Sequence, residues 1–335
     1  MTQKKSVTII DIADYLGISH TTVSRALNGS QKVKEITRRK VIDAAHTLNY
    51  SPNLNARGLN QGRSYIIGLF FTDLQNGTSS LFLTSIITSI KSQLPANYVL
   101  SINAISDDGL ANTFDGVVIV SQSARDQPFI DQFVKTGIPL VVLNRHIENP
   151  KVINYWLDNY NAARELTTHA LSQGYKNVAL IRGDLTYTST TERSRGFYDA
   201  IERWLDASDY DVFVHPPVEG EYSVIGGYNA MSKLLRRKSV PEYVFIENDD
   251  MAIGALHAIN ESNDLAFPIS VSGFDDVSFA SYTTPALTTV HSPVGSMTEL
   301  GIRALKNLIS NDSIEDVPFR NGFDMPIVYR DTLKK

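Results

Sequence analysis

The sequence predicts an α plus α/β protein with a three-helix head containing a helix-turn-helix, a short linker, and a two-lobed core with parallel sheets. Helical apolar spacing in the first 50 residues predicts the head, and alternating strands and helices from Tyr65 onwards predict the core. The charged residues are also unevenly distributed between the two parts. Residues 1–62 hold nine Lys and Arg against four Asp and Glu, whereas the rest of the chain has a net charge of −10. A basic head on an acidic body indicates that the head contacts a polyanion.

Composition excludes several classes of protein. The 335 residues predict two or three domains, and 42% hydrophobic residues are enough for sizeable cores. The absence of cysteine excludes disulfides, thiolate catalysis and cysteine-bound metals. No apolar stretch approaches the roughly 18–20 residues of a membrane span, and no apolar signal region opens the sequence. We therefore expect a soluble cytoplasmic protein.

Enzyme motifs are also missing from the sequence. It has no Gly-x-x-x-x-Gly-Lys loop, no Gly-x-Gly-x-x-Gly after the first strand and no His-Glu-x-x-His. The seven histidines form no i, i+4 pair, which leaves a histidine-based metal site without support. We therefore expect no enzymatic activity, no cofactor and no metal.

Three short helices are predicted in the head. Thr8 and Asp11 fit a capping box, and Gly17 ends the first helix, whose apolar residues are Ile9, Ile12, Ala13 and Leu16. Ser19 is the expected N-cap of a second helix over 20–28 that buries Val23, Ala26 and Leu27. A third helix over 35–48 has Ile36, Val41, Ala44, Ala45 and Leu48 on its inner side.

The second helix has the chemistry of a recognition helix. His20 and Thr21 at its start would reach base edges in a major groove, and Arg25 could pair bidentately with guanine. Thr22 and Ser24 suit phosphate oxygens, which position a protein without reading the sequence. From the helices alone, a small domain that binds another protein explains the pattern equally well.

The head contains four motifs, Val7-Thr8-Ile9-Ile10-Asp11-Ile12-Ala13, Gly17-Ile18-Ser19, Thr22-Val23-Ser24-Arg25-Ala26-Leu27-Asn28 and Tyr50-Ser51-Pro52-Asn53. These motifs closely resemble the DNA-binding domain of the LacI/GalR family of bacterial transcription regulators. The resemblance implies a head over residues 1–50, a hinge over 51–63 and an effector-binding core over 64–335. It also implies contacts to DNA from Thr8, Ser19, His20, Thr21, Thr22, Ser24, Arg25, Asn28, Asn53, Ala56, Arg57 and Leu59. Lys34 departs from the family, which usually has Ser or Thr capping the third helix.

The linker from Pro52 to Arg63 is too short for an independently stable helix, and Gly58 adds about 1 kcal/mol against one. Composition alone therefore predicts a flexible tether. The family resemblance implies instead a hinge helix that folds when two chains meet on DNA. In that arrangement Leu59 would wedge into the minor groove and Arg57 would lie near phosphate.

The core is predicted from its alternating segments. We expect strands at 65–71, 98–102, 116–120, 139–143, 178–181, 212–215, 243–246 and 269–273. Helices are expected at 81–94, 127–136, 193–205, 225–235 and 251–259. Such alternation predicts parallel sheets covered by helices, and two sets of it predict two lobes with a ligand cleft at the carboxyl ends of the strands.

The core also resembles the family, whose fold is that of the periplasmic sugar-binding proteins. Its landmarks include Arg193-Ser194-Arg195-Gly196-Phe197, Asn248-Asp249-Asp250-Met251-Ala252 and Gly273-Phe274-Asp275-Asp276. The resemblance implies three crossings between an N-lobe (about 64–158 and 290–319) and a C-lobe (about 159–289 and 320–335). Between Ile102 and Phe114 the sequence is too short for a helix that relatives usually have.

Effector binding is predicted at the ends of the strands. Arg193 matches the family arginine that holds ligand hydroxyls or carboxylates, with an exposed helix-start arginine as the alternative. Asn248 and Asp275 would hydrogen-bond the ligand or cap nearby turns, Asp249 would be a structural N-cap, and Tyr222 would be an aromatic platform or ordinary packing. Six further candidates are Asn76, Thr78, Phe82, Asn144, Arg145 and Ser292.

Together these features predict a homodimeric repressor that a small sugar releases from palindromic operator DNA. Asn144-Arg145 and Val290-His291-Ser292-Pro293 resemble galactose-type repressors, which favours a galactose-like sugar or a galactoside. One alternative is a regulator of the same family whose DNA binding is strengthened by a purine or a phosphorylated carrier protein. Another is a sugar-binding protein without DNA activity.

Overall fold

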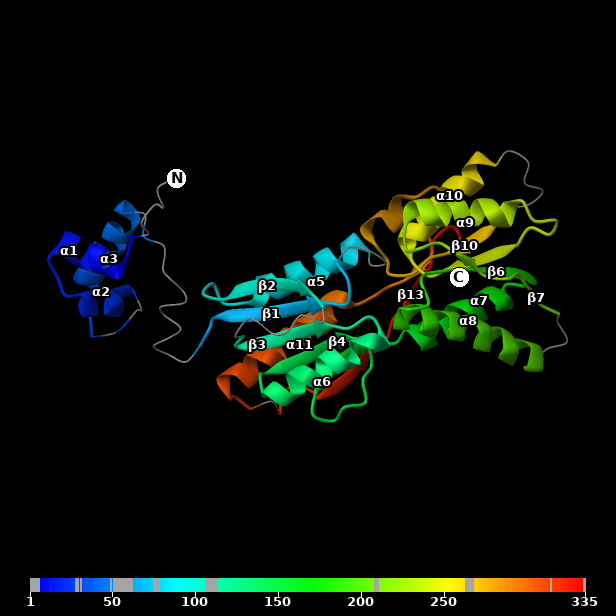
Figure 1. Cartoon of the computed structure of the whole chain (residues 1–335). Coiled ribbons are helices and arrows are strands. Elements are labelled where there is room, and N and C mark those ends of the chain that lie inside the picture. The colour runs from blue at the N-terminus through cyan, green and yellow to red at the C-terminus, as the bar shows by residue number, and fades with distance from the viewer. Residues whose placement is uncertain are drawn as a thin grey trace. The chain divides into compact units, whose positions relative to one another are not determined.

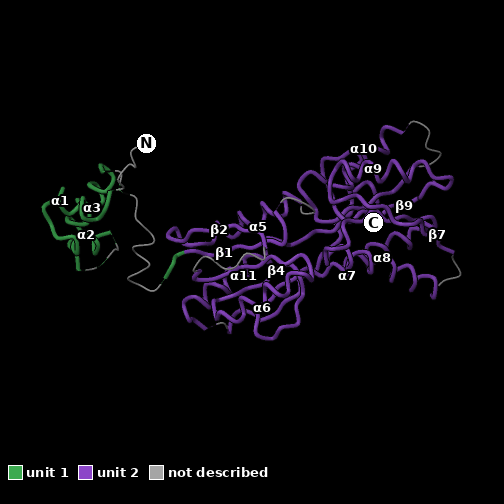
Figure 2. Tube along the Cα trace, viewed as in Figure 1, with its two compact units in different colours: residues 1–65 green, residues 66–335 purple. Residues whose placement is uncertain are grey.

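The computed structural model describes residues 7–27, 30, 32–48, 50, 63–74, 79–105, 114–207, 211–262, 268–313 and 315–333. The chain divides into two compact units, Met1–Tyr65 and Ile66–Lys335 (Figure 2). In the described part of the chain, no helix is long and apolar enough to cross a membrane, and no group of His, Asp and Glu could hold a metal ion.

The first unit contains three helices around a small apolar core. They are α1 (Ile9–Leu16), α2 (His20–Leu27) and α3 (Glu35–Thr47). The capping box predicted for α1 is present, since the Thr8 backbone N–H donates to Asp11 Oδ2 at 2.7 Å and Thr8 Oγ1 accepts from the Asp11 backbone. Gly17 ends α1 with φ of 64°, a conformation that glycine adopts without steric cost.

Most predictions for the head are confirmed. Ser19 Oγ accepts from the Thr22 backbone N–H at 3.2 Å and so caps α2, whereas Lys34 makes no side-chain cap for α3. Ile12, Val23 and Val41 are fully buried together. The prediction for Ile36 was wrong, because its side chain is 69% exposed: it lies in the first turn of α3, on the side away from the other two helices.

The N-lobe is a six-stranded parallel sheet in the order β12-β5-β4-β3-β1-β2 (Figure 1). Its strands are β1 (Ile66–Phe71), β2 (Val99–Ala104), β3 (Gly116–Val120), β4 (Leu140–Asn144), β5 (Ile153–Leu157) and β12 (Arg320–Phe323). Its helices are α5 (Ser80–Gln93), η1 (Ala124–Asp126), α6 (Gln127–Thr136) and α11 (Val294–Ser310). On β3, Val118 and Val120 face α5 and α11, whereas Val117 and Ile119 face α6. Because both faces are covered, this strand is apolar along its whole length.

The C-lobe has a smaller parallel sheet in the order β10-β9-β6-β7, with β8 paired to β6. Its strands are β6 (Asn177–Arg182), β7 (Phe213–Val214), β8 (Val218–Glu219), β9 (Tyr243–Ile246) and β10 (Ser270–Ser272). One face packs on α7 (Asn159–Ser172) and α8 (Thr188–Ala207), and the other packs on α9 (Val224–Leu235) and α10 (Asp249–Glu261). The two lobes therefore share one architecture.

Three segments join the lobes. The chain passes from β5 to α7, returns through β11 (Thr289–Val290) to α11, and crosses again between β12 and β13 (Ile327–Val328), which pairs antiparallel with β11. We expected residues 320–335 in the C-lobe, but 320–323 form β12 and pair with β5 in the N-lobe sheet. We placed the last boundary between the N-lobe and the C-lobe too early in the chain. The short strand β12 forms because it pairs with the edge strand β5, and its own sequence does not indicate that partner.

Several elements were missed or lie outside the described residues. The strand β5 and the helices α7 and α11 were not assigned from the sequence, although α11 joins α5 in covering the N-lobe sheet. A short 3-10 helix, η2 (Ser278–Tyr282), follows β10. The predicted loss of a helix between Ile102 and Phe114 falls mostly on residues 106–113, which the structure does not describe.

Candidate functional site

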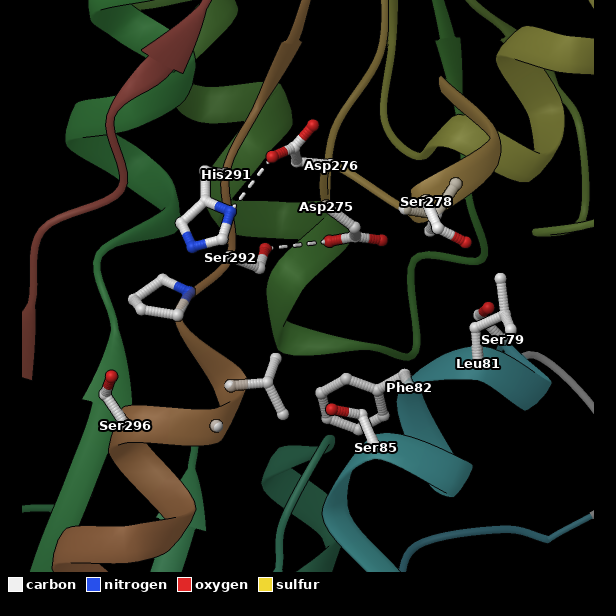
Figure 3. A pocket seen from close by; sticks show the side chains of 14 residues that line it. Ser79, Leu81, Phe82, Ser85, Asp275, Asp276, Ser278, His291, Ser292 and Ser296 are labelled. Carbon is white, nitrogen blue, oxygen red and sulfur yellow. Dashed lines mark hydrogen bonds and ion pairs between the residues drawn. The ribbon is translucent and has the colours of Figure 1, made fainter. Parts of the chain in front are cut away.

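Two adjoining cavities lie between the lobes of the core. The inner cavity has a volume of about 50 Å³ and the outer one about 420 Å³, and Ser79, Phe82 and Asp275 line both. Figure 3 shows the outer cavity, with Phe82 and Ser85 on α5 facing Ser292 and the loop that carries Asp275 and Ser278. The inner cavity receives most of the predicted effector residues.

Arg193 projects from α8 into the wall of the inner cavity, where it is only 5% exposed. Its Nε donates to Asn159 Oδ1 at 2.9 Å, its Nη1 to the Glu247 carbonyl, and its Nη2 to Asp275 Oδ1 at 3.1 Å. The guanidinium also stacks on the Phe274 ring, 3.8 Å from its centroid. Three of its five N–H groups are used in this way, so the protein fixes its orientation and leaves two donors.

Asn248 combines a structural role with an available donor. Its Oδ1 accepts from the Met251 backbone N–H at 2.9 Å and caps α10, which fixes the direction of the side chain. Its Nδ2 is buried and has no hydrogen-bond partner among the described residues, although Asn248 lines the inner cavity. A buried amide without a partner is costly, so this group is suited to a ligand that brings an acceptor.

Asp249 is structural, as predicted, but Asn248 rather than Asp249 is the N-cap of α10. The Asp249 carboxylate is buried and accepts from Thr289 Oγ1 at 2.6 Å and from the Val277 backbone N–H at 2.8 Å. Burial raises its pKa to about 8. Asp249 therefore joins α10 to the loop after β10 and to β11, below the site.

Asp275 supplies the acceptor of the inner cavity. Its Oδ1 accepts from Arg193 and from Ser292 Oγ at 3.1 Å, and Oδ2 has no donor among the described residues. Burial raises the pKa of this carboxyl group, and the Arg193 charge opposes the shift. The backbone at Asp275 has φ of 105°, a conformation that few non-glycine residues adopt. The loop therefore imposes an unusual backbone conformation at the residue that carries this carboxylate.

Tyr222 forms an aromatic wall of the same cavity. Its ring lies directly on Gly183, where an added Cβ would come within 2.0 Å of it, and its hydroxyl hydrogen-bonds Thr190 Oγ1 at 2.6 Å. Tyr187 packs edge-on to Tyr222 with centroids 6.0 Å apart. Burial raises the pKa of the Tyr222 hydroxyl, which keeps it protonated.

The N-lobe candidates fall into three groups: residues that line the inner cavity, a residue that lines neither cavity, and residues that the structure does not describe. Phe82 and Asn144 line the inner cavity, and Asn144 Nδ2 also donates to the Ser121 carbonyl at 3.1 Å. Arg145 lines neither cavity, because its guanidinium is bound to Ser121 Oγ at 2.8 Å and to Gln127 Oε1 at 3.0 Å. Asn76 and Thr78 lie outside the described residues.

Sequence reasoning missed several residues of the site. Gln122, Leu157, Tyr187 and Ser189 also line the inner cavity. Gln122 lies just after the end of β3, and Asn144 lies at the end of the neighbouring strand β4. Its position after a buried strand could therefore have marked Gln122 as a candidate. Beneath the cavity, the fully buried Glu247 accepts from the Gly183 backbone at 2.9 Å and from Ser194 Oγ at 2.7 Å, and burial raises its pKa to about 7.

The head presents its predicted recognition residues on one exposed helix. His20, Thr21 and Arg25 are exposed on α2, while Thr22 is half-buried and within 2.8 Å of the Ser19 hydroxyl. The predicted DNA contacts Asn28, Asn53, Ala56, Arg57 and Leu59 lie outside the described residues. The exposed face of α2 therefore carries the Arg25 guanidinium and side-chain hydroxyl groups, as in a helix-turn-helix surface that contacts DNA.

Comparison with known families identifies both units. Residues 8–53 match the bacterial regulatory proteins of the lacI family, and residues 96–318 match the periplasmic binding proteins and sugar binding domain of the LacI family. The chain belongs to the LacI family. This LacI-family chain is a DNA-binding transcriptional repressor rather than an enzyme, and its predicted fold class is confirmed.

Relatives and solved structures agree with that assignment over almost the whole chain. The chain is 39% identical to the probable HTH-type transcriptional repressor ExuR of Bacillus subtilis, over 91% of this chain and 92% of the relative. It is 28% identical to catabolite control protein A of Priestia megaterium, over 92% and 95%. The Lac repressor dimer bound to operator and an anti-inducer superposes with a TM-score of 0.79 at 26% identity, over 99% of this chain and 100% of that one.

Proposed function

We propose that this repressor is a homodimer that a small sugar releases from a palindromic operator. The observation that carries the sugar assignment is the set of groups in the inner cavity. Arg193 and Asn248 provide donors, Asp275 Oδ2 provides an acceptor, and all three are held by bonds to other protein groups. Fixed donors beside a fixed acceptor suit adjacent hydroxyls of a sugar ring.

Aromatic side chains complete this environment. Phe82 from the N-lobe and Tyr222 from the C-lobe both line the inner cavity, so a ring that enters it contacts polar groups and aromatic faces together. Sugars have apolar C–H surfaces as well as hydroxyls, and pockets of this kind use a few placed polar groups on an apolar lining. The combination favours a sugar over a purely polar ion.

The charge of the cavity favours a neutral sugar. Arg193 and Asp275 are the charged side chains among the described residues that line the inner cavity, and they pair with each other at 3.1 Å. A carboxylate ligand at the free donors of Arg193 would place a second negative charge beside the Asp275 carboxylate, which is unfavourable. We therefore propose a galactose-like sugar or a galactoside, in keeping with the resemblance of residues 144–145 and 290–293 to galactose-type repressors.

The DNA-binding part of the proposal rests on α2. Its exposed start, with His20 and Thr21, and Arg25 one turn further on match a helix that enters a major groove. Two such heads in a homodimer would contact two half-sites, so the operator should be palindromic. A coupling of about 1–3 kcal/mol between sugar and DNA would change operator affinity about 5- to 150-fold.

Fluorescence anisotropy with a palindromic duplex, selected from a random pool, tests both parts. Binding should be tight, weaken steeply between two salt concentrations, and be released by galactose or methyl galactoside. Galacturonate, which differs from galactose by the carboxylate at C6, tests the charge argument. If galacturonate alone released the duplex, the sugar class would stand and the neutral ligand would be wrong.

Two other outcomes separate the alternatives. A purine that strengthens operator binding would establish a corepressor and overturn the release by sugar. A chain that binds no selected duplex at any salt concentration would overturn the DNA-binding part.

Leu59→Ala is expected to weaken specific operator binding and leave sugar affinity nearly unchanged, because the proposed wedge acts on the minor groove alone. Equal operator affinity in this variant would remove the wedge.

A further inference from the structure

A buried carboxylate joins the ends of two N-lobe strands. Asp126 in η1 is only 1% exposed, and its Oδ2 accepts from Thr72 Oγ1 just after β1 at 2.6 Å and from Ser121 Oγ just after β3 at 2.9 Å. The backbone N–H groups of Gln122 and Ser123 donate to the same oxygen at 3.1 and 3.2 Å. One carboxylate therefore holds residues 121–123, which we call the β3 loop.

Strand β4 is joined to the β3 loop through Ser121. The Ser121 carbonyl accepts from Asn144 Nδ2 at 3.1 Å, and the Ser121 hydroxyl accepts from Arg145 Nε at 2.8 Å while it donates to Asp126. Burial lowers the pKa of Arg145, and the negative charges of Asp126 and Glu192 oppose that shift. The Arg145 guanidinium therefore belongs to the same network as the Asp126 carboxylate.

The β3 loop also contacts the C-lobe directly. The Thr188 backbone N–H donates to the Gln122 carbonyl at 2.8 Å, and Ser123 Oγ donates to the Thr186 carbonyl at 2.8 Å. Between these two C-lobe residues lies Tyr187, which lines the inner cavity. The position of the β3 loop therefore affects residues on both sides of that cavity.

Asp126 itself is not among the described residues that line either cavity. A buried charge adds little net stability compared with well-packed apolar groups, because its removal from water is costly. A hydrogen-bonded network of buried polar groups instead holds its members in one arrangement. The members held here include Gln122 and Asn144, which line the inner cavity from the N-lobe.

We propose that Asp126 is a positioning residue for effector binding, which holds the β3 loop so that Gln122 and Asn144 are directed at the effector. The inference rests on the proposed function for its effector. Asp126 acts through these two side chains and does not touch the ligand. Loss of its hydrogen bonds therefore lowers effector affinity and leaves the DNA-binding surface unchanged.

Substitution of Asp126 tests the role of its hydrogen bonds. Asp126→Ala should lower the affinity for galactose and methyl galactoside about tenfold, because the donors of the β3 loop lose their common acceptor. Asp126→Asn keeps an oxygen for these donors and should stay within about threefold of the parent. Glu148→Ala removes an exposed carboxylate from the same lobe and is the control, with parental affinity expected. Calorimetric titration measures all four proteins.

Thr72→Val tests the same network without removing a buried charge. It keeps the shape of the side chain and removes one donor to Asp126, so we expect about a threefold loss of affinity for the two sugars. Operator binding without sugar should match the parent in every variant, because the head is a separate compact unit. Parental sugar affinity in both Thr72→Val and Asp126→Ala would overturn the proposal, and Thr72→Val decides alone if Asp126→Ala does not fold.

Coupling to Gln122 separates positioning from a general loss of stability. Gln122→Ala removes one of the side chains that Asp126 is proposed to direct and leaves the main-chain bonds of the loop in place. In that background, Asp126→Ala should reduce sugar affinity clearly less than the roughly tenfold expected in the parent. Equal reductions in both backgrounds would show that the two residues act separately and would overturn the proposal.

Hydrogen exchange followed by mass spectrometry needs no sugar and reports the opening of individual segments. In Asp126→Ala, and to a smaller extent in Thr72→Val, peptides over 116–127 and 183–190 should exchange faster than in the parent. Peptides over β9 in the C-lobe should exchange as in the parent. Unchanged exchange over 116–127, or equally accelerated exchange throughout the core, would overturn the positioning role.

The two measurements distinguish a failed inference from a failed function. If neither sugar binds the parent, the proposed effector is wrong, and exchange over 116–127 still supports or overturns the role of Asp126. If the sugars bind the parent and Asp126→Ala equally well, the proposed effector stands and Asp126 has no positioning role.

Discussion

The two lobes of the core have the same architecture but contribute differently to the site. From the C-lobe come Arg193, Tyr222, Asn248 and Asp275, and the bonds that orient the Arg193 guanidinium all end on C-lobe groups. The N-lobe adds Phe82, Gln122 and Asn144. One half of the site is therefore held in shape within its own lobe, and the other half depends on where the N-lobe lies.

This difference has an energetic consequence. Groups that are already oriented lose little conformational freedom when a ligand arrives, so their contacts contribute most to affinity. The contacts of the N-lobe groups depend also on the spacing between the two lobes. We therefore expect substitutions in the C-lobe half to reduce effector affinity more than comparable substitutions in the N-lobe half.

Arg193→Ala should have the largest effect. It removes the two remaining guanidinium donors and leaves Asp275 without its charge partner, so sugar affinity should fall at least about 100-fold. Operator binding without sugar should change less than about threefold, because the head is a separate compact unit. Calorimetric titration and anisotropy measure the two affinities. Arg195→Ala, an exposed neighbour on α8, is the control; a sugar response that survives in Arg193→Ala would refute the assignment.

Asn248→Asp separates the cap from the donor. An aspartate keeps the oxygen that caps α10 but replaces the cavity-facing amide by an acceptor, so we expect about a ten- to 100-fold loss of sugar affinity. The melting temperature should stay within about 2 °C of the parent. Unchanged sugar affinity would mean that Asn248 serves α10 alone.

Phe82→Ala tests the N-lobe half. The ring lines both cavities from α5, so its loss should weaken sugar binding by about fivefold to tenfold. The neighbouring Leu81→Ala, which alters the outer cavity only, should have a smaller effect. An effect of Phe82→Ala as large as that of Arg193→Ala would break the proposed asymmetry between the lobes.

A smaller effect concerns pH and belongs to the C-lobe. Burial raises the pKa of Glu247 from 4.5 to about 7, so the folded protein holds a proton that the unfolded chain releases. Stability from this group is therefore complete below about pH 4.5 and is lost as pH rises to about 7. The melting temperature should fall by a few degrees over that window.

Glu247→Gln should reduce that fall, because glutamine keeps an acceptor for Gly183 and can donate to Ser194. The exposed Glu202→Gln is the control for loss of charge and should leave the pH profile as it is. Scanning calorimetry between pH 5 and 8 compares the three proteins. A profile of Glu247→Gln identical to the parent would show that Glu247 does not titrate in this range.

Much of the head could be predicted from the sequence because its determinants are local. Thr8, Asp11, Gly17 and Ser19 act within a few residues of their own position, and capping depends on just such short spacings. Ile36 was placed wrongly because helical periodicity alone does not decide which side of a short helix the other helices cover.

In the core, local pattern predicted the central strands but not the elements defined by distant partners. Strands β1, β3, β4, β6 and β9 are apolar runs buried on both faces, and such runs are visible in the sequence. The strand β12 has no such run, and it exists because β5 leaves an edge for it to pair with. The helix α11 was missed although it covers much of the N-lobe sheet.

The sequence by itself determined the family, the two-part organisation, and the identity of Arg193, Asn248 and Asp275 as candidates, since each stands in a recognisable motif. Only the tertiary structure decided that Asn248 caps α10 while its amide stays unpaired, that Arg145 is bound elsewhere, and that Ser79 reaches Asp250. The reason is physical. A motif specifies which groups a chain can offer, whereas pairing, burial and cavity volume depend on segments that lie apart in the sequence. The partners of Arg145 are 18 and 24 residues away, and Ser79 and Asp250 are 171 residues apart.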